Sequence, residues 1–156
     1  MADQGSTPIR ILFLCTGNSA RSQMAEALLR HYGNGRFAAY SAVTRPAERV
    51  HSLAIAAMEQ IGIPLDGQFP KTLDTLMRDR DLSWSYVITT CDEAEEACPT
   101  FPGDTKRIHW NFPDPVAAPG MDDERLRAFR VVRDEIRRRV QLFVGLGVHQ
   151  RLNSAR

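Results

Sequence analysis

The stretch IRILFLCTGNSARSQMAE, residues 9–26, joins a strand pattern directly to a helix pattern, and the architecture of the chain follows from it. Residues 9–14 form an apolar run of the kind that makes a buried strand. The segment after the loop repeats apolar residues at helical spacing, namely Met24, Ala25, Leu28, Leu29 and Tyr32. Gly33-Asn34-Gly35 then ends the predicted helix. Cys15 therefore lies in a short loop between a strand and a helix.

The rest of the chain alternates strand and helix patterns in the same way. Further strands are predicted at residues 36–42, 86–89 and 105–110, and helices at residues 49–61, around residues 73–77 and from Asp122 to Val144. Such alternation is typical of an α/β fold. We predict a single domain, residues 1–156, with flexible ends at 1–8 and 149–156 and a four-stranded parallel sheet with helices on both faces. Ligands bind such sheets at the carboxyl ends of the strands, where Cys15 and Cys91 both fall.

The charge balance argues against several classes of partner. The 156 residues carry 20 basic and 19 acidic side chains, a formal charge of +1, which is no electrostatic footprint for nucleic acid or an anionic membrane. The apolar run at residues 11–14 is too short for a signal-peptide core or a membrane span. We therefore expect a cytoplasmic protein, whose three cysteines are buried, metal-binding or reactive rather than a disulfide framework.

Residues 15–22 have the composition of an oxyanion-binding loop that contains a nucleophile. Consecutive backbone N–H groups and the N-terminus of the following helix can form a nest for a tetrahedral anion, and Gly17 permits the backbone angles that it needs. Arg21 adds a planar donor that grips two oxygens. These positive surroundings should lower the pKa of the Cys15 thiol, unless Cys15 is merely a small buried residue. The predicted substrate-binding residues are Thr16, Gly17, Asn18, Ser19, Ala20, Arg21 and Ser22.

Residues 14–26 resemble the active-site loop of the arsenate reductases in the low-molecular-weight tyrosine phosphatase superfamily. The resemblance covers about residues 9–145 and implies a phosphatase-type P-loop after the first strand, with Cys15 as the nucleophile. The phosphatases commonly carry proline after the Arg-Ser pair, where this chain has Gln23. Many reductases of this kind have another cysteine inside the loop, where this chain has Ala20.

Cys91 and Cys98 are predicted to form a thiol relay with Cys15. Their spacing does not suit zinc, and none of the four histidines clusters with them. Attack of Cys15 on arsenate would give an adduct, and Cys91 attacking that adduct would supply two electrons, release arsenite and leave a Cys15–Cys91 disulfide. Cys98 could then attack Cys91 and move the disulfide outward to an external reductant. The family that the chain resembles uses the same three-cysteine pattern.

The segment between the two later cysteines is predicted to be helical. Asp92 followed by Glu95 has the form of a capping box, so residues 92–97 should make a short helix. Both cysteines could instead be structural. Cys98, however, lies among acidic residues and before Pro99, a composition typical of a surface.

Asp114 is the candidate general acid. Flanking Pro113 and Pro115 would hold it rigidly after the fourth strand, although a simple Asp-Pro turn is the alternative. The resemblance favours the acid, because Asp114 matches the acid of the superfamily. It also implies a potassium site found in some members, at the positions Asn18, Glu26, Ser41 and Asp74. His109 and Trp110, which precede the acid loop, are interpreted as packing residues.

The resemblance implies an arsenate reductase for arsenic detoxification that binds no cofactor and needs an external thiol reductant. Thioredoxin is the expected partner, while glutaredoxin with glutathione serves other three-cysteine relatives. Phosphate and sulfate should compete with arsenate. Two alternatives stay open: a low-molecular-weight protein tyrosine phosphatase using Cys15, Arg21 and Asp114, and a non-catalytic protein that binds arsenic or an oxyanion. Weak phosphatase activity is also expected of a reductase.

Overall fold

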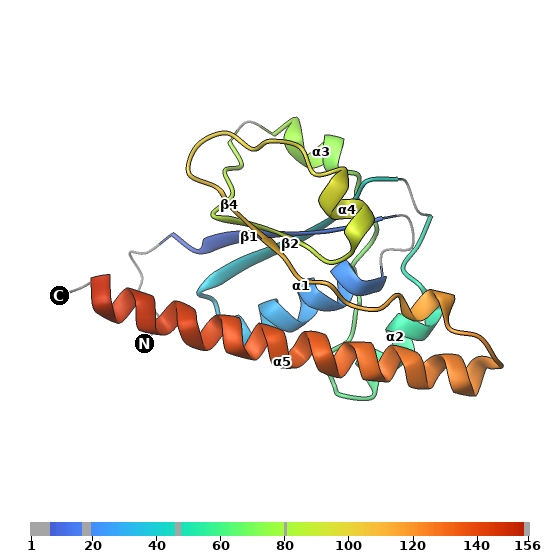
Figure 1. The fold of residues 1–156 in the computed structure, drawn as a ribbon. Coiled ribbons are helices and arrows are strands. Elements are labelled where there is room, and N and C mark those ends of the chain that lie inside the picture. The colour runs from blue at the N-terminus through green and yellow to red at the C-terminus, as the bar shows by residue number, and fades with distance from the viewer. Residues whose placement is uncertain (1–6, 17–19, 46–47, 80, 155–156) are drawn as a thin grey trace.

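Four parallel strands form the central sheet, in the order β2-β1-β3-β4 (Figure 1). The computed structural model describes residues 7–16, 20–45, 48–79 and 81–154, and side chains as far as residue 146. The strands are β1 (Ile9–Cys15), β2 (Phe37–Val43), β3 (Tyr86–Thr89) and β4 (Lys106–His109). All four predicted strands are confirmed, to within one residue at each end. That the two chain ends are flexible stays a prediction.

Helices cover both faces of the sheet, as predicted (Figure 1). One face carries α1 (Ala20–Gly33), α2 (Ser52–Glu59) and α5 (Asp122–Ser154), and the other carries α3 (Leu73–Met77) and α4 (Asp92–Glu96). A short 3₁₀ helix, η1 (Pro115–Ala117), precedes α5. The last helix extends beyond the predicted end at Val144, because glycines cost a helix about 1 kcal/mol each and no proline follows to end it. Within the described ranges, no helix combines the length and the apolar character needed to cross a membrane.

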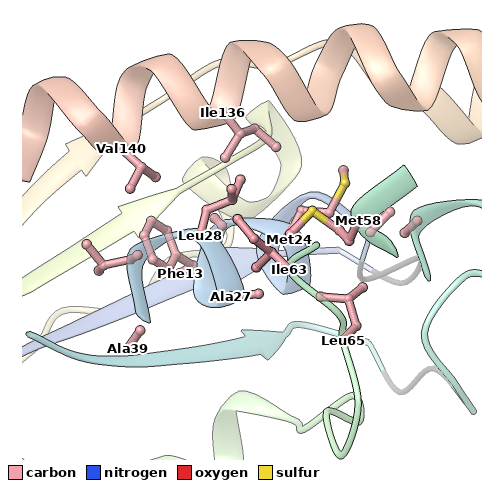
Figure 2. Close-up of a cluster of buried hydrophobic side chains, with 14 of the residues drawn as sticks. Phe13, Met24, Ala27, Leu28, Ala39, Met58, Ile63, Leu65, Ile136 and Val140 are labelled. Carbon is pink, nitrogen blue, oxygen red and sulfur yellow. The ribbon is translucent and has the colours of Figure 1, made fainter. Parts of the chain in front are cut away.

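The residues of β1 alternate between two apolar cores. Ile11 and Phe13 belong to the larger core under α1, α2 and α5, while Leu12 and Leu14 belong to the smaller core under α3 and α4. Figure 2 shows the larger core, in which Phe13 and Leu28 lie beneath Ile136 and Val140 of α5. A strand buried on both faces needs apolar residues at every position, which explains the continuous apolar run.

The smaller core is covered by two helices of five residues each. Its buried members are Leu12, Leu14, Cys15, Ala42, Leu76, Trp84, Val87, Cys91 and Ala94. Ala94 anchors α4 because its side chain is completely buried against this core. Cys15 and Cys91 therefore lie on the thinly covered face of the sheet.

Candidate active site

Cys15 and Cys91 lie in contact at the carboxyl end of the sheet. Cys15 is the last residue of β1, and Cys91 follows β3, which pairs in parallel with β1. Both side chains are buried, and their thiols share a hydrogen bond. The parallel topology thus brings together two cysteines that are far apart in the sequence.

The surroundings of Cys91 favour its thiolate. Cys91 caps the N-terminus of α4, and its Sγ accepts a hydrogen bond from the backbone N–H of Ala94 at 3.4 Å. The hydroxyl of Thr16 lies 3.9 Å from the same sulfur. The hydrogen bond from Cys15, then the Ala94 N–H and the charge of Arg21, lower the pKa of Cys91 to about 5. Cys91 therefore holds the negative charge of the pair.

Cys15 holds the proton of the pair. Its hydrogen bond to Cys91 and its burial raise the pKa of Cys15 well above the ordinary value, and the charge of Arg21 acts in the opposite direction without reversing this. The prediction that the loop lowers the pKa of Cys15 is therefore wrong for this arrangement, because the neighbouring sulfur takes the charge first. A sequence pattern around one cysteine could not reveal this, since Cys91 is distant in the chain.

We expect the reduced protein to carry a single thiolate over a wide pH range. Cys91 should lose its proton near pH 5, whereas Cys15 should lose its proton only well above 9.0, the ordinary value for a thiol. The ultraviolet absorbance of the thiolate should therefore disappear as the pH is lowered through about 5, when Cys91 is protonated. It should increase above its neutral-pH level only in alkaline solution, when Cys15 also ionises. Cys98→Ser should keep the acid transition and Cys91→Ser should lose it. A reduced protein with no thiolate at neutral pH would contradict this electrostatic assignment.

Arg21 connects the cysteine loop with the segment that carries Asp114. The guanidinium is almost fully buried, and it donates a hydrogen bond of 2.9 Å to the carbonyl of Phe112. Phe112 precedes Asp114 by two residues, so this bond fixes the acid loop relative to the start of α1. Arg21 is thus held at the site by a contact that sequence spacing alone does not indicate.

The other predicted substrate-binding residues fall into two groups. Ala20 and Ser22 are buried in the first turn of α1, and the Ser22 hydroxyl has no hydrogen-bond partner among the described residues. An unsatisfied buried hydroxyl costs about 1–3 kcal/mol, so the Ser22 hydroxyl is suited to donate a hydrogen bond to a thiolate or to a bound anion. Thr16 lines a hollow of about 480 Å³ together with residues of α4. The backbone nest predicted at Gly17, Asn18 and Ser19 lies outside the described residues.

Asp114 caps η1 and is exposed to solvent. Its Oδ1 accepts a hydrogen bond of 3.0 Å from the backbone N–H of Val116, which is the turn role considered as an alternative. Within the described residues the second carboxyl oxygen makes no hydrogen bond, so capping and acid catalysis are compatible. Within the described part of the chain, Asp114 makes no hydrogen bond to Cys15 or Arg21, and Phe112 is the link between them.

Cys98 is separated from Cys91 by α4. All three cysteines are free, and Cys98 is partly buried. Burial raises the pKa of Cys98, partly offset by the charge of Arg107. A helical rise of about 1.5 Å per residue would place the Cα atoms of Cys91 and Cys98 roughly 10 Å apart, whereas a disulfide needs about 4.4–6.8 Å. The predicted helix is confirmed over Asp92–Glu96, with Cys91 rather than Asp92 as its capping residue. That it opens before these sulfurs join stays a prediction.

Comparison with known proteins gives a single answer about ancestry. The profile of the low molecular weight phosphotyrosine protein phosphatase family matches residues 10–155. The chain belongs to this family. A curated relative, the arsenate reductase of Halalkalibacterium halodurans, is 43% identical over 138 residues, which cover 88% of this chain and 96% of the relative.

Solved structures of the same family agree with the fold. An arsenate reductase in the phosphate binding state superposes with a TM-score of 0.69 at 30% identity, covering 88% of this chain and 97% of that chain. A thioredoxin-dependent arsenate reductase of Corynebacterium glutamicum has a TM-score of 0.61 at 28% identity, covering 88% of this chain and 64% of that chain.

Gln23, at the position where the resemblance implies proline in the phosphatases, anchors a neighbouring segment to α1. Its side chain is buried and donates a hydrogen bond of 3.1 Å to the carbonyl of Phe69. The Gln68 side chain in turn donates to Gln23 Oε1 at 2.7 Å. Proline has no side-chain donor or acceptor, so it could not anchor residues 68–69 to α1 in this way.

The potassium site that the resemblance implies is matched only in part. Glu26 Oε2 and the Ser41 hydroxyl are buried oxygens without hydrogen-bond partners among the described residues, which suits a monovalent cation. Arg30 and Lys71, however, already face the other carboxyl oxygen of Glu26 at 3.4 and 4.0 Å. Asp74 is exposed on α3, with no ion pair or hydrogen bond to Glu26 in the described part of the chain. Asn18 lies outside the described residues.

Three polar residues near the cysteines have contacts that the sequence did not predict. Thr89 and His109 end β3 and β4, Arg107 lies within β4, and all three contact the acidic side chains of α4 directly or through one another. His109 is therefore not the packing residue it was predicted to be, because its ring nitrogens contact Thr89 and Asp92. Their positions in the sequence could have indicated a role at the site, since Thr89 and His109 are the last residues of strands whose carboxyl ends face it.

Proposed function

We propose that this chain reduces arsenate to arsenite, with Cys15 as the nucleophile and Cys91 and Cys98 as the relay, in arsenic detoxification. The observation that carries the proposal is the contact between Cys15 and Cys91, which hold one thiolate and one thiol beside Arg21. A phosphatase needs one nucleophilic thiol, whereas a reductase needs a second thiol, because the two electrons that reduce As(V) come from two thiols as they form a disulfide. The family relationship to arsenate reductases supports the same reading.

In the first step, a sulfur–arsenic bond forms as an arsenic–oxygen bond breaks. The proton shared by the two sulfurs moves from Cys15 to Cys91, so the Cys15 thiolate attacks As(V). Arg21 stabilises the negative oxygens during attack, and the carboxyl of Asp114 gives its proton to the departing oxygen, which leaves as water. Cys15 then carries a covalent arsenic(V) adduct.

In the second step, Cys91 attacks the sulfur of Cys15. Cys91 first gives the proton it received to an oxygen of the arsenic adduct. The sulfur–arsenic bond breaks, and its electron pair stays on arsenic, which becomes As(III) and leaves as arsenite. The N–H of Ala94 and the hydroxyl of Thr16 favour the thiolate needed for this attack. A Cys15–Cys91 disulfide remains.

In the third step, Cys98 attacks Cys91 and regenerates the Cys15 thiol. An external dithiol then reduces the Cys91–Cys98 disulfide, and the thioredoxin dependence of the Corynebacterium glutamicum relative supports thioredoxin as that dithiol. No step of this scheme uses a bound cofactor or potassium. A cycle that starts from three reduced thiols suits the cytoplasm, where disulfides are rare.

A coupled assay tests the proposal. The reduced protein is given arsenate and NADPH with thioredoxin and thioredoxin reductase, or with glutaredoxin, glutathione and glutathione reductase, and arsenite is quantified. The same protein is given an aryl phosphate, and phosphate is quantified. Arsenite formation with either reductant supports the reductase. Phosphate release without arsenite would favour a phosphatase, and arsenate binding without turnover would favour a binding protein.

Asp114→Asn should slow formation of the arsenate adduct by about 10²–10⁴-fold, because the leaving oxygen loses its proton donor. Asparagine can still accept the hydrogen bond from Val116, so η1 should keep its cap. Single-turnover measurement of arsenite release, with phosphate inhibition as a measure of anion affinity, separates the two effects. An unchanged single-turnover rate would leave Asp114 with its capping role alone.

A further inference from the structure

A chain of hydrogen bonds ties α4 to the ends of β3 and β4. Asp92 Oδ1 lies 3.0 Å from Nε2 of His109, and Nδ1 of His109 lies 2.8 Å from the hydroxyl oxygen of Thr89. Thr89 donates to Glu95 Oε2 at 2.7 Å. The chain therefore begins and ends on carboxylates of α4 and passes through one side chain of each neighbouring strand.

Arg107 holds the same helix from β4. Its guanidinium donates to the backbone carbonyl of Glu95 and lies 3.3 Å from Glu95 Oε1. The hydrogen bond from Thr89, and then the charges of Arg107 and His109, keep the pKa of Glu95 below its ordinary value. Glu95 is thus bound as a carboxylate by donors from two strands.

Three hydrogen bonds join the two carboxylates, and each needs a proton. The Thr89 hydroxyl supplies one, and ionised carboxylates supply none. The His109 ring takes part in the other two, as donor or acceptor according to its tautomer. The network therefore joins two carboxylates of α4 to side chains of both strands, with the Arg107 guanidinium facing Glu95.

We infer that Thr89, Arg107 and His109 form a latch that holds α4 closed and must release it before Cys98 can reach Cys91. This inference rests on the proposed relay. The closed helix keeps Cys91 beside Cys15 for the attack that releases arsenite, since the N–H of Ala94 binds the Cys91 sulfur. The open segment serves the next attack. The three residues are positioning residues, because no hydrogen bond joins any of them to the sulfurs of Cys91 or Cys98 among the described residues, and Arg107 acts on Cys98 through its charge alone.

Removing the latch should favour the Cys91–Cys98 disulfide. In a Cys15→Ser background, oxidised glutathione takes two electrons from Cys91 and Cys98, which form the disulfide as two glutathione thiols are released. Thr89→Val deletes a fully buried hydroxyl with little change of volume, and Glu95→Ala deletes the carboxylate that binds it. Each should raise the equilibrium constant for the disulfide about five- to tenfold, the effect of losing one or two such hydrogen bonds.

Two matched variants control for effects other than the latch. Thr89→Ser keeps the hydroxyl and should behave like the parent. Glu93→Ala deletes a carboxylate from the same helix, but Glu93 lies outside the network and lines the hollow beside Thr16, so it should also behave like the parent. If Glu93→Ala and Glu95→Ala shift the disulfide equilibrium constant equally, the effect comes from the net charge of the helix, and the latch is overturned.

Hydrogen exchange of the reduced proteins tests the latch without arsenate or disulfide. The amides of Glu95 and Ala97, which donate to Cys91 and Glu93 carbonyls inside α4, should exchange about five- to tenfold faster in Thr89→Val and Glu95→Ala. Parental exchange and parental disulfide equilibrium in both variants would overturn the latch. If the parent forms no Cys91–Cys98 disulfide at all, the relay fails, and exchange alone decides whether the network holds α4.

Discussion

Cys15→Ser is expected to lower arsenate reduction by on the order of 10⁴–10⁶-fold, the loss usual when an enzyme loses its nucleophile. Two reasons act together. A serine hydroxyl is scarcely ionised near neutral pH, so it attacks arsenic poorly. An oxygen at this position also cannot form a disulfide with Cys91, so arsenic has no route to its two electrons even if an adduct forms.

The measurement is arsenite release in a single turnover, with the disulfide state of the protein determined by mass after alkylation. Serine is close to cysteine in size, and Cys15 is buried in the smaller core, so the fold should survive. Thermal unfolding and phosphate binding provide the controls. Substantial arsenite production by folded Cys15→Ser would refute the proposed mechanism.

The second large effect is expected from the other two cysteines, and the two variants should fail at different stages. Cys98→Ser should release a single arsenite per chain and then stop with a Cys15–Cys91 disulfide, because no third thiol resolves it. Cys91→Ser should release none by the intramolecular route, because its adduct has no neighbouring thiolate. Both should therefore lose steady-state turnover almost completely.

Rapid-quench assays with arsenite counting, followed by mapping of the disulfides, distinguish these stages. The Cys98→Ser burst should have the same rate as the first turnover of the parent, since Cys98 acts only afterwards. Parental steady-state turnover by Cys98→Ser with thioredoxin would remove Cys98 from the relay. A burst of arsenite from Cys91→Ser would show that another thiol or water completes the reduction.

Most of the fold could be predicted from local sequence patterns. The apolar run of β1 and the helical spacing of α1 correctly predicted the first strand and the first helix. The parallel pairing of β1 with β3 then places Cys91 next to Cys15. The spacing of Asp92 and Glu95 also correctly predicted the short helix α4. The helix is capped by Cys91 instead, because Glu95 turns toward Thr89 and Arg107 on neighbouring strands.

Features that depend on distant contacts could not be predicted. The direction of the pKa shift of Cys15 is set by Cys91, and the role of His109 is set by Asp92 and Thr89. Composition around either residue contains no trace of these partners. The length of α5 was missed for a different reason, since glycine is only a weak signal for a helix end when no proline accompanies it.

The unequal covering of the two faces of the sheet divides the molecule into regions of different local stability. The larger core binds three helices, so its amides should exchange only through global unfolding. The layer formed by α3 and α4 buries far fewer side chains and should open in a sub-global event that leaves the rest intact. Under the proposed relay, we expect a change of sulfur oxidation state to open this layer while the other remains a folded unit. The proposed cycle would then never populate an unfolded, aggregation-prone state.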